Sequence, residues 1–181
     1  MKIPKDAKKV FTGKIYDVYH WEQEMLDGSF QTFEELWRPD SAIVLATKNG
    51  KLLIAKETQP RNGTFWGFFG GRIEKNETAL EAAKRELEEE TGMSSNNWSE
   101  LFKYEMPHSD WTLNYFIAKD CELTTKPKAD IGEHIEIHEI DFKDLPKYMN
   151  KKNWREQLIK VAFLSELDKD KLTNLKKSLE L

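Results

Sequence analysis

The sequence is poor in features that mark secreted, membrane-spanning or nucleic-acid-coating proteins. Its single cysteine, Cys121, cannot form a disulfide within one chain, so a reducing cytoplasmic setting is expected. No apolar run approaches the roughly 20 residues that span a bilayer. The formal net charge is -4, which leaves no large basic excess to neutralise a phosphate backbone. We therefore expect no membrane and no nucleic-acid partner, and we interpret Cys121 as a structural residue rather than a catalytic thiol.

No internal repeat and no low-complexity tract divides the chain. Its 181 residues suit one domain with a small N-terminal addition. Alternating apolar and polar residues predict strands. Asp27-Gly28 and Asn49-Gly50 are residue pairs typical of hairpin turns, and each separates two such strands. The segments expected to form strands are 14–37 (as a hairpin), 41–46, 51–55, 65–69, 111–118 and 133–140.

One helix is indicated clearly. Thr78 followed three residues later by Glu81 forms a capping-box pattern, and Gly92 is a C-terminal stop signal. A second capping-box pattern, Asn153 with Glu156, predicts a helix through about Leu167, and a shorter helix is expected over 168–179. Apolar residues along one face of the first helix are Leu80, Ala83 and Leu87. Helices among strands predict a mixed β-sheet sandwiched between helices, an α+β (α/β) fold.

The first helix carries Glu86, Glu89 and Glu90 at spacings that place them on one face. Like charges at this spacing repel each other, and a divalent cation bound among the carboxylates would offset that repulsion. Several carboxylate oxygens with water and phosphate are the ligands that magnesium prefers. The alternative interpretation is an acidic, solvated helix face.

The residues around these glutamates favour the metal. The pattern resembles the Nudix box, Gly-x5-Glu-x7-Arg-Glu-apolar-x-Glu-Glu-x-Gly-apolar, at every specified position. The matching residues are Gly71, Glu77, Arg85, Glu86, Leu87, Glu89, Glu90, Gly92 and Met93. The resemblance implies a Nudix fold and hydrolysis of a phosphoric anhydride with Mg²⁺, for which Mn²⁺ could substitute.

The resemblance also implies roles for individual residues. Arg85 would orient the glutamates, while Glu77 would either pair with Arg85 or contact the metal. A general base is needed to activate water, and Glu89 and the loop acids Glu133 and Asp130 compete for that role, with Glu133 preferred over Asp130. The metal ligands would be the Gly70 carbonyl, Glu86, Glu89 and Glu90.

Residues 14–145 further resemble the ADP-ribose and nucleoside diphosphate sugar pyrophosphatase branch. The resemblance implies a β extension over 1–40 that forms a homodimer, and a hydrolase domain over 41–181 with C-terminal helices. The small-molecule nucleotide would be cut to a nucleoside monophosphate and a sugar phosphate. The substrate-binding candidates are Phe33, which would stack on the base, Glu34 beside it, and Arg38, which would contact the diphosphate. Ordinary sheet packing of Phe33 and a surface position for Arg38 remain open.

Two segments depart from that branch. Glu57-Thr58-Gln59 stands where the branch often has Gln-aromatic-Arg, so one phosphate-binding arginine is missing. Arg61, two positions further on, is the candidate to replace it. Gly67-Phe68-Phe69 replaces the usual Glu-Leu-Pro. His108 has two interpretations, a contact with the substrate or a solvated loop residue. Two alternatives therefore stay open: a hydrolase of nucleoside triphosphates or dinucleoside polyphosphates, and a Nudix-like module that binds a nucleotide without cutting it.

Overall fold

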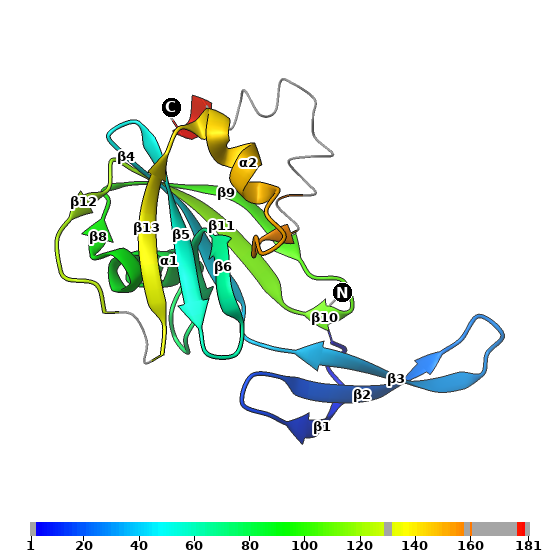
Figure 1. Cartoon of the computed structure of the whole chain (residues 1–181). Helices are drawn as coiled ribbons and strands as arrows, with labels where there is room; N and C mark the ends of the chain where they lie inside the picture. Colours follow the sequence, from blue (N-terminus) through cyan, green and yellow to red (C-terminus); the bar gives the residue numbers. More distant parts are fainter. Residues whose placement is uncertain (1–2, 129–131, 158–159, 161–176, 180–181) are drawn as a thin grey trace.

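A computed structural model describes residues 3–128, 132–157, 160 and 177–179. The protein has a central seven-stranded sheet and a separate four-stranded N-terminal sheet, which extends away from the body (Figure 1). The strands are β1 (Lys8–Thr12), β2 (Asp17–Glu24), β3 (Phe30–Trp37), β4 (Ser41–Lys48), β5 (Lys51–Gln59), β6 (Gly63–Gly67), β7 (Phe69–Arg72), β8 (Met93–Ser94), β9 (Asn97–Glu105), β10 (Ser109–Asp110), β11 (Thr112–Lys119), β12 (Glu122–Leu123) and β13 (His134–Ile140). The helices are α1 (Ala79–Thr91), the 3₁₀ turn η1 (Phe142–Asp144) and α2 (Leu145–Met149).

The central sheet is mixed, as the sequence predicts. Its order is β13-β5-β4-β11-β9, with β6 paired to β5 and β7 paired to β4. The β4–β11 pair is parallel and the other pairs are antiparallel. The predicted Asn49-Gly50 turn joins β4 to β5, and both residues have positive φ, as a tight hairpin turn requires.

The sheet buries a different apolar cluster on each face. Side chains alternate along β4, so Val44 packs on one face and Leu45 on the other. Ala83 and Leu87 of α1 complete the Val44 cluster. Leu145 and other residues near α2 complete the Leu45 cluster, so the sheet lies between helical segments (Figure 1). The predicted α+β sandwich is confirmed.

The signals at both ends of α1 are confirmed. The Thr78 hydroxyl accepts a hydrogen bond from the Glu81 amide, and the Glu81 carboxylate accepts one from the Thr78 amide. Gly92 ends the helix with φ +69, in the left-handed region that favours glycine. Cys121 is buried and its thiol has a pKa raised to about 11 by that burial, which supports the structural interpretation.

The predicted capping box at Asn153 is wrong. The Asn153 amide nitrogen donates to the Thr64 carbonyl, and the buried Glu156 carboxylate accepts a hydrogen bond from the Phe68 amide. Both side chains are hydrogen-bonded to β6 or to the residue after it and cannot cap a helix. The helix therefore begins only at Gln157. Most of both predicted C-terminal helices lies outside the described residues. Among the described residues, no helix is both long and apolar enough to cross a bilayer.

Candidate active site

Two glycines bring the backbone of β7 against the acidic face of α1. Gly70 has φ +139, and a Cβ there would overlap the Ala42 carbonyl. A Cβ on Gly71 would lie 2.7 Å from the Glu86 carboxyl carbon. The Gly70 amide donates to Glu90 Oε2 at 3.0 Å. Glycine at position 70 is therefore required by the backbone of β4, and glycine at position 71 leaves room for the Glu86 carboxylate.

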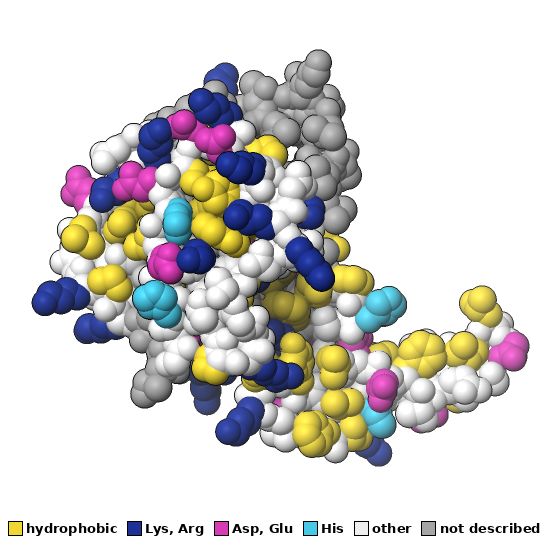
Figure 2. Space-filling view, in the orientation of Figure 1, with side chains coloured by type: hydrophobic (Ala, Val, Ile, Leu, Met, Phe, Trp, Pro, Cys, Tyr) yellow, Lys and Arg dark blue, Asp and Glu magenta, His cyan; other side chains and the backbone are white. Residues whose placement is uncertain are grey.

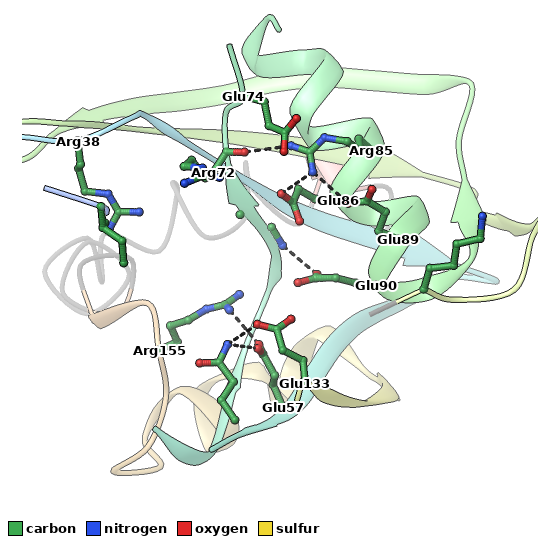
Figure 3. A pocket seen from close by; sticks show the side chains of 15 residues that line it. Arg38, Glu57, Arg72, Glu74, Arg85, Glu86, Glu89, Glu90, Glu133 and Arg155 are labelled. Atoms are coloured by element: carbon green, nitrogen blue, oxygen red, sulfur yellow. Dashed lines mark hydrogen bonds and ion pairs between the residues drawn. The ribbon is translucent and has the colours of Figure 1, made fainter. Parts of the chain in front are cut away.

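Arg85 holds the acidic residues of the site in a fixed arrangement (Figure 3). Its Nε lies 2.8 Å from Glu77 Oε1, and its Nη2 lies 2.9 Å from Glu77 Oε2. Its Nη1 donates to Glu86 at 2.8 Å and to Glu89 at 3.0 Å. The hydrogen bonds from Arg85 hold the pKa of Glu77 below its usual range, and those carboxylates raise the pKa of Arg85. These contacts bring Glu77, Glu86 and Glu89 together at Arg85, and the orienting role of Arg85 in the reaction stays a prediction.

Glu90 is the most deeply placed carboxylate of this helix face. It is only 9% exposed, and burial raises its pKa to about 8. The Arg155 charge and the Gly70 amide act in the opposite direction, but they do not offset the loss of hydration. A nearby cation would favour the ionised form of the carboxylate, so the environment of Glu90 suits a ligand of a metal ion.

The donor set of the site fits a hard divalent cation. Glu86, Glu89 and Glu90 all line one cavity beside Gly70 and supply oxygen ligands alone. Within the described residues, no group of three or more His, Cys, Asp or Glu side chains forms a preformed metal cluster. The Arg85 guanidinium binds Glu86 and Glu89 and neutralises part of their repulsion. Metal ligation by Glu86, Glu89, Glu90 and the Gly70 carbonyl stays a prediction.

The opposite wall of the cavity combines the predicted Glu133 with Glu57, Gln59 and Arg155, which sequence reasoning did not assign to the site. Gln59 Nε2 donates to Glu57 at 2.6 Å and to Glu133 at 2.8 Å. Arg155 Nη1 donates to Glu57 at 3.0 Å, so a hydrogen-bonded chain runs from Arg155 to Glu133 (Figure 3). The cavity has a volume of about 630 Å³. Its charged lining residues are Arg38, Arg72, Arg85, Lys128, Arg155, Glu57, Glu74, Glu86, Glu89, Glu90 and Glu133.

A second cavity of about 400 Å³ adjoins the first, and its walls are mainly apolar, although Arg38, Arg72 and Arg155 also border it. Met106, Trp111 and Tyr115 line it, while Gly70 and Gly71 are among the residues that border both cavities. The acidic wall thus opens onto a space that suits an uncharged ring.

Arg38 stands at the junction of the two cavities. Its guanidinium lies 4.2 Å from the centre of the Trp111 ring and 5.5 Å from that of the Tyr16 ring. Among the described residues it forms no ion pair with a carboxylate, and its Nε is buried without a hydrogen-bond partner. Aromatic stacking therefore orients this guanidinium while its charge remains available to an anionic ligand.

The remaining candidates are spread over the molecule. Phe33 and Glu34 lie on β3 and do not line the cavity, since Phe33 contacts the Trp21 ring and Glu34 contacts His20. Their substrate contact stays a prediction and would involve another copy of the chain. Arg61 and His108 are exposed turn residues outside both linings, and Asp130 lies outside the described residues.

The charged wall facing α1 had only a weak sequence signal. Glu57 and Gln59 were visible as a departure from a pattern, but nothing local connected them to Arg155. Arg155 directly precedes Glu156, which was assigned to a capping box instead. The ion pair between Arg155 and Glu57, which lie 98 positions apart, becomes apparent only in the folded chain.

Comparisons with known proteins agree with this geometry. The chain is 30% identical to the ADP-ribose pyrophosphatase of Bacillus subtilis over 145 residues, which is 77% of this chain and 78% of the relative. It is 34% identical to the 8-oxo-dGTP diphosphatase of Proteus vulgaris over 91 residues, 48% of this chain and 81% of the relative. A solved structure described as an ADP compounds hydrolase has a similar fold, with a TM-score of 0.67 at 22% identity, covering 82% of this chain and 86% of its own.

A model of the NUDIX domain matches residues 36–162, a span that contains the glycine pair, the acidic helix and the opposite wall. Together with the relative from Bacillus subtilis, this match shows that the chain belongs to the Nudix hydrolases.

Proposed function

We propose that this protein hydrolyses the pyrophosphate bond of a nucleoside diphosphate sugar of the ADP-ribose type, with Mg²⁺ as cofactor and Mn²⁺ as a substitute. The observation that carries the proposal is one cavity in which the glutamates of α1 face Arg155, with Arg38 at its rim. A diphosphate needs both walls, because a metal on the acidic wall and cations opposite can share its negative charge. The name of the relative from Bacillus subtilis, an ADP-ribose pyrophosphatase, supports this choice.

The reaction adds water across the bridging anhydride. The water oxygen bonds to one phosphorus, the bond from that phosphorus to the bridging oxygen breaks, and the products are a nucleoside monophosphate and a sugar phosphate. A divalent ion held by Glu86 and Glu90 would offset charge on the phosphates and lower the pKa of the attacking water. Glu133 and Glu89 are the candidates that accept the water proton, since both line the cavity. Arg38 would bind the diphosphate where the two cavities meet.

A second substrate class has its own support. The relative from Proteus vulgaris is an 8-oxo-dGTP diphosphatase, and the apolar cavity beside Trp111 has room for an uncharged ring. A nucleoside triphosphate would release inorganic pyrophosphate instead of a sugar phosphate. The two functions therefore differ in their products as well as in their substrates.

Product identification tests the proposal. The purified chain is incubated with ADP-ribose, GDP-mannose, UDP-glucose and 8-oxo-dGTP, each with MgCl₂, MnCl₂ or EDTA. We expect a nucleoside monophosphate and a sugar phosphate, formed only with a metal. Preferential release of pyrophosphate from 8-oxo-dGTP would favour the second substrate class. Tight nucleotide binding without any product would instead indicate a non-catalytic module.

We also propose that the N-terminal sheet forms a homodimer. Phe11, Val18 and Leu36 are neighbours across β1, β2 and β3 and therefore lie on one face. Phe11 and Leu36 are 59% and 42% exposed, and apolar side chains gather on this extension in Figure 2. A row of exposed apolar side chains on a projecting sheet is typical of a protein–protein contact. A second copy would cover this row and could bring Phe33 near a substrate.

A further inference from the structure

The segment that follows α2 is joined to β6 by backbone hydrogen bonds around one isolated β-bridge. The Trp66 amide donates to the Asn153 carbonyl at 2.9 Å, and the Arg155 amide donates to the Trp66 carbonyl at 2.7 Å. Trp154 between them is buried and forms an isolated parallel bridge with Trp66. Its ring meets the Phe68 ring edge to face, with centroids 5.2 Å apart. The backbone on both sides of Arg155 is therefore fixed against β6.

This attachment directs the Arg155 side chain into the catalytic cavity. Nη1 donates to Glu57 at 3.0 Å, Nε donates to Glu156 at 2.9 Å, and Nη2 donates to the Phe68 carbonyl. Glu57 and Glu156 are 2% and 5% exposed, so each needs a cationic partner. The three contacts hold the planar guanidinium in one orientation.

The same guanidinium remains accessible to a ligand. The Arg155 side chain is 33% exposed and lines both cavities. A guanidinium has five N–H donors, and the three contacts above use one on each nitrogen, which leaves a second hydrogen on Nη1 and on Nη2. Figure 3 shows Arg155 on the wall opposite Glu86 and Glu89. A diphosphate between these walls would meet Arg155 on the side away from the acidic helix.

We propose that Arg155 binds a non-bridging phosphoryl oxygen of the substrate diphosphate and, through Glu57 and Gln59, positions Glu133 for the attacking water. The inference rests on the proposed function and deepens it, because the segment after α2 would supply the phosphate-binding arginine that is missing after β5. The arginine and the candidate base then belong to one hydrogen-bonded chain. Binding of the diphosphate at one end would order the carboxylate at the other.

Binding measurements separate this role from simple attachment of the segment. The variants are Arg155→Ala and Arg155→Lys, with Asn153→Ala as the matched control. Asn153 belongs to the same segment as Arg155 and its side chain donates a hydrogen bond to Thr64 of β6, but it lines neither cavity. The probes are α,β-methylene ADP-ribose, which cannot be hydrolysed at the diphosphate, and adenosine, which has no phosphate. Calorimetry gives dissociation constants, and steady-state kinetics on ADP-ribose give KM and kcat.

We expect Arg155→Ala to weaken binding of the methylene analogue by about 10- to 100-fold, the usual effect of losing a charge-assisted hydrogen bond. Adenosine binding should change less than about twofold by the same reasoning, because no phosphate is involved. Arg155→Lys should recover part of the affinity but less of kcat, since a lysine cannot hold Glu57 in the same way. Millimolar guanidinium should partly restore activity to Arg155→Ala, and Asn153→Ala should behave as the wild type.

Other outcomes would overturn the inference. Unchanged analogue binding in both Arg155 variants, or equal weakening of analogue and adenosine, would mean that Arg155 only attaches the segment. If Arg155→Ala does not fold, Arg155→Lys with wild-type KM and kcat would lead to the same conclusion. A wild-type protein that neither binds nor cuts any nucleoside diphosphate sugar would refute the proposed function itself, so the two failures are distinguishable.

Discussion

The Gly70 amide donates a hydrogen bond to Glu90 Oε2 at 3.0 Å, which ties the strand-end glycine pair directly to the acidic face of α1. Glu90 is buried at this contact, and its pKa is raised to about 8 because burial removes water from the carboxylate. The contact therefore fixes the most buried carboxylate of the acidic face of α1 before any cation is bound.

Replacing Glu90 with the isosteric glutamine is expected to abolish the response to metal. Glu90→Gln should lower hydrolysis of ADP-ribose on the order of 100-fold or more, because a charged ligand is lost. Mg²⁺ should raise the melting temperature of the wild type but not of the variant. The control is Glu88→Gln, an exposed residue of the same helix outside the cavity lining. Equal Mg²⁺ stabilisation of all three proteins would refute metal binding by Glu90.

The two glycines of the pair should fail in different ways. Gly70→Ala places a Cβ against the Ala42 carbonyl at a positive φ, so it should lower the free energy of unfolding by about 2 kcal/mol or more. The three atoms nearest to a Cβ at position 71 all belong to the Glu86 carboxylate, which can rotate. Gly71→Ala should therefore reduce Mg²⁺ affinity about 10- to 100-fold with little loss of stability. Urea unfolding and Mg²⁺ titration distinguish the two, and a stability loss in both variants would contradict the assignment.

Cys121 should make stability fall at alkaline pH. Burial raises the pKa of its thiol from 9.0 to about 11, so the native state disfavours the thiolate and loses stability as pH rises from 9 towards 11. Between pH 7.5 and 10 the wild type should lose about 1 kcal/mol more unfolding free energy than Cys121→Ala. Urea unfolding at both pH values measures this difference.

Cys121→Ala should also retain wild-type turnover of ADP-ribose at neutral pH, because the thiol lies outside the cavity. Loss of turnover in a folded variant would restore the catalytic interpretation of the thiol, and parallel pH profiles would contradict its buried environment.

The N-terminal sheet provides a test of assembly. Leu36→Asp introduces a charge into the exposed row with Phe11 and Val18, so a dimer should dissociate to a monomer in light scattering after gel filtration. Phe33→Ala lies on the opposite face of the strand and should leave the dimer intact while raising KM. A wild-type monomer at micromolar concentration, or a dimer that survives Leu36→Asp, would contradict the proposed interface.

Local patterns were sufficient where one segment contained all the interacting groups. Thr78, Glu81 and Gly92 predicted both ends of α1, because capping involves residues three or four positions apart. The hairpin at Asn49-Gly50 depended likewise on local backbone preference. The same reasoning failed at Asn153 and Glu156. Their side chains do not cap a helix: Asn153 contacts Thr64 of β6, and Glu156 contacts Phe68, the residue after β6. Tertiary hydrogen bonds to Thr64 and Phe68 outweighed a local preference worth about 1 kcal/mol.

The sequence by itself determined the α+β architecture, the acidic helix and the family, because a short periodic pattern or a fixed residue spacing predicts each of them. Only the tertiary structure decided what faces that helix: Arg155, Glu57 and Gln59 converge there from β5 and from the segment beyond α2. Their pairing follows from burial, since the carboxylates of Glu57 and Glu156 are withdrawn from water and require a guanidinium, whose position in the sequence no local pattern constrains.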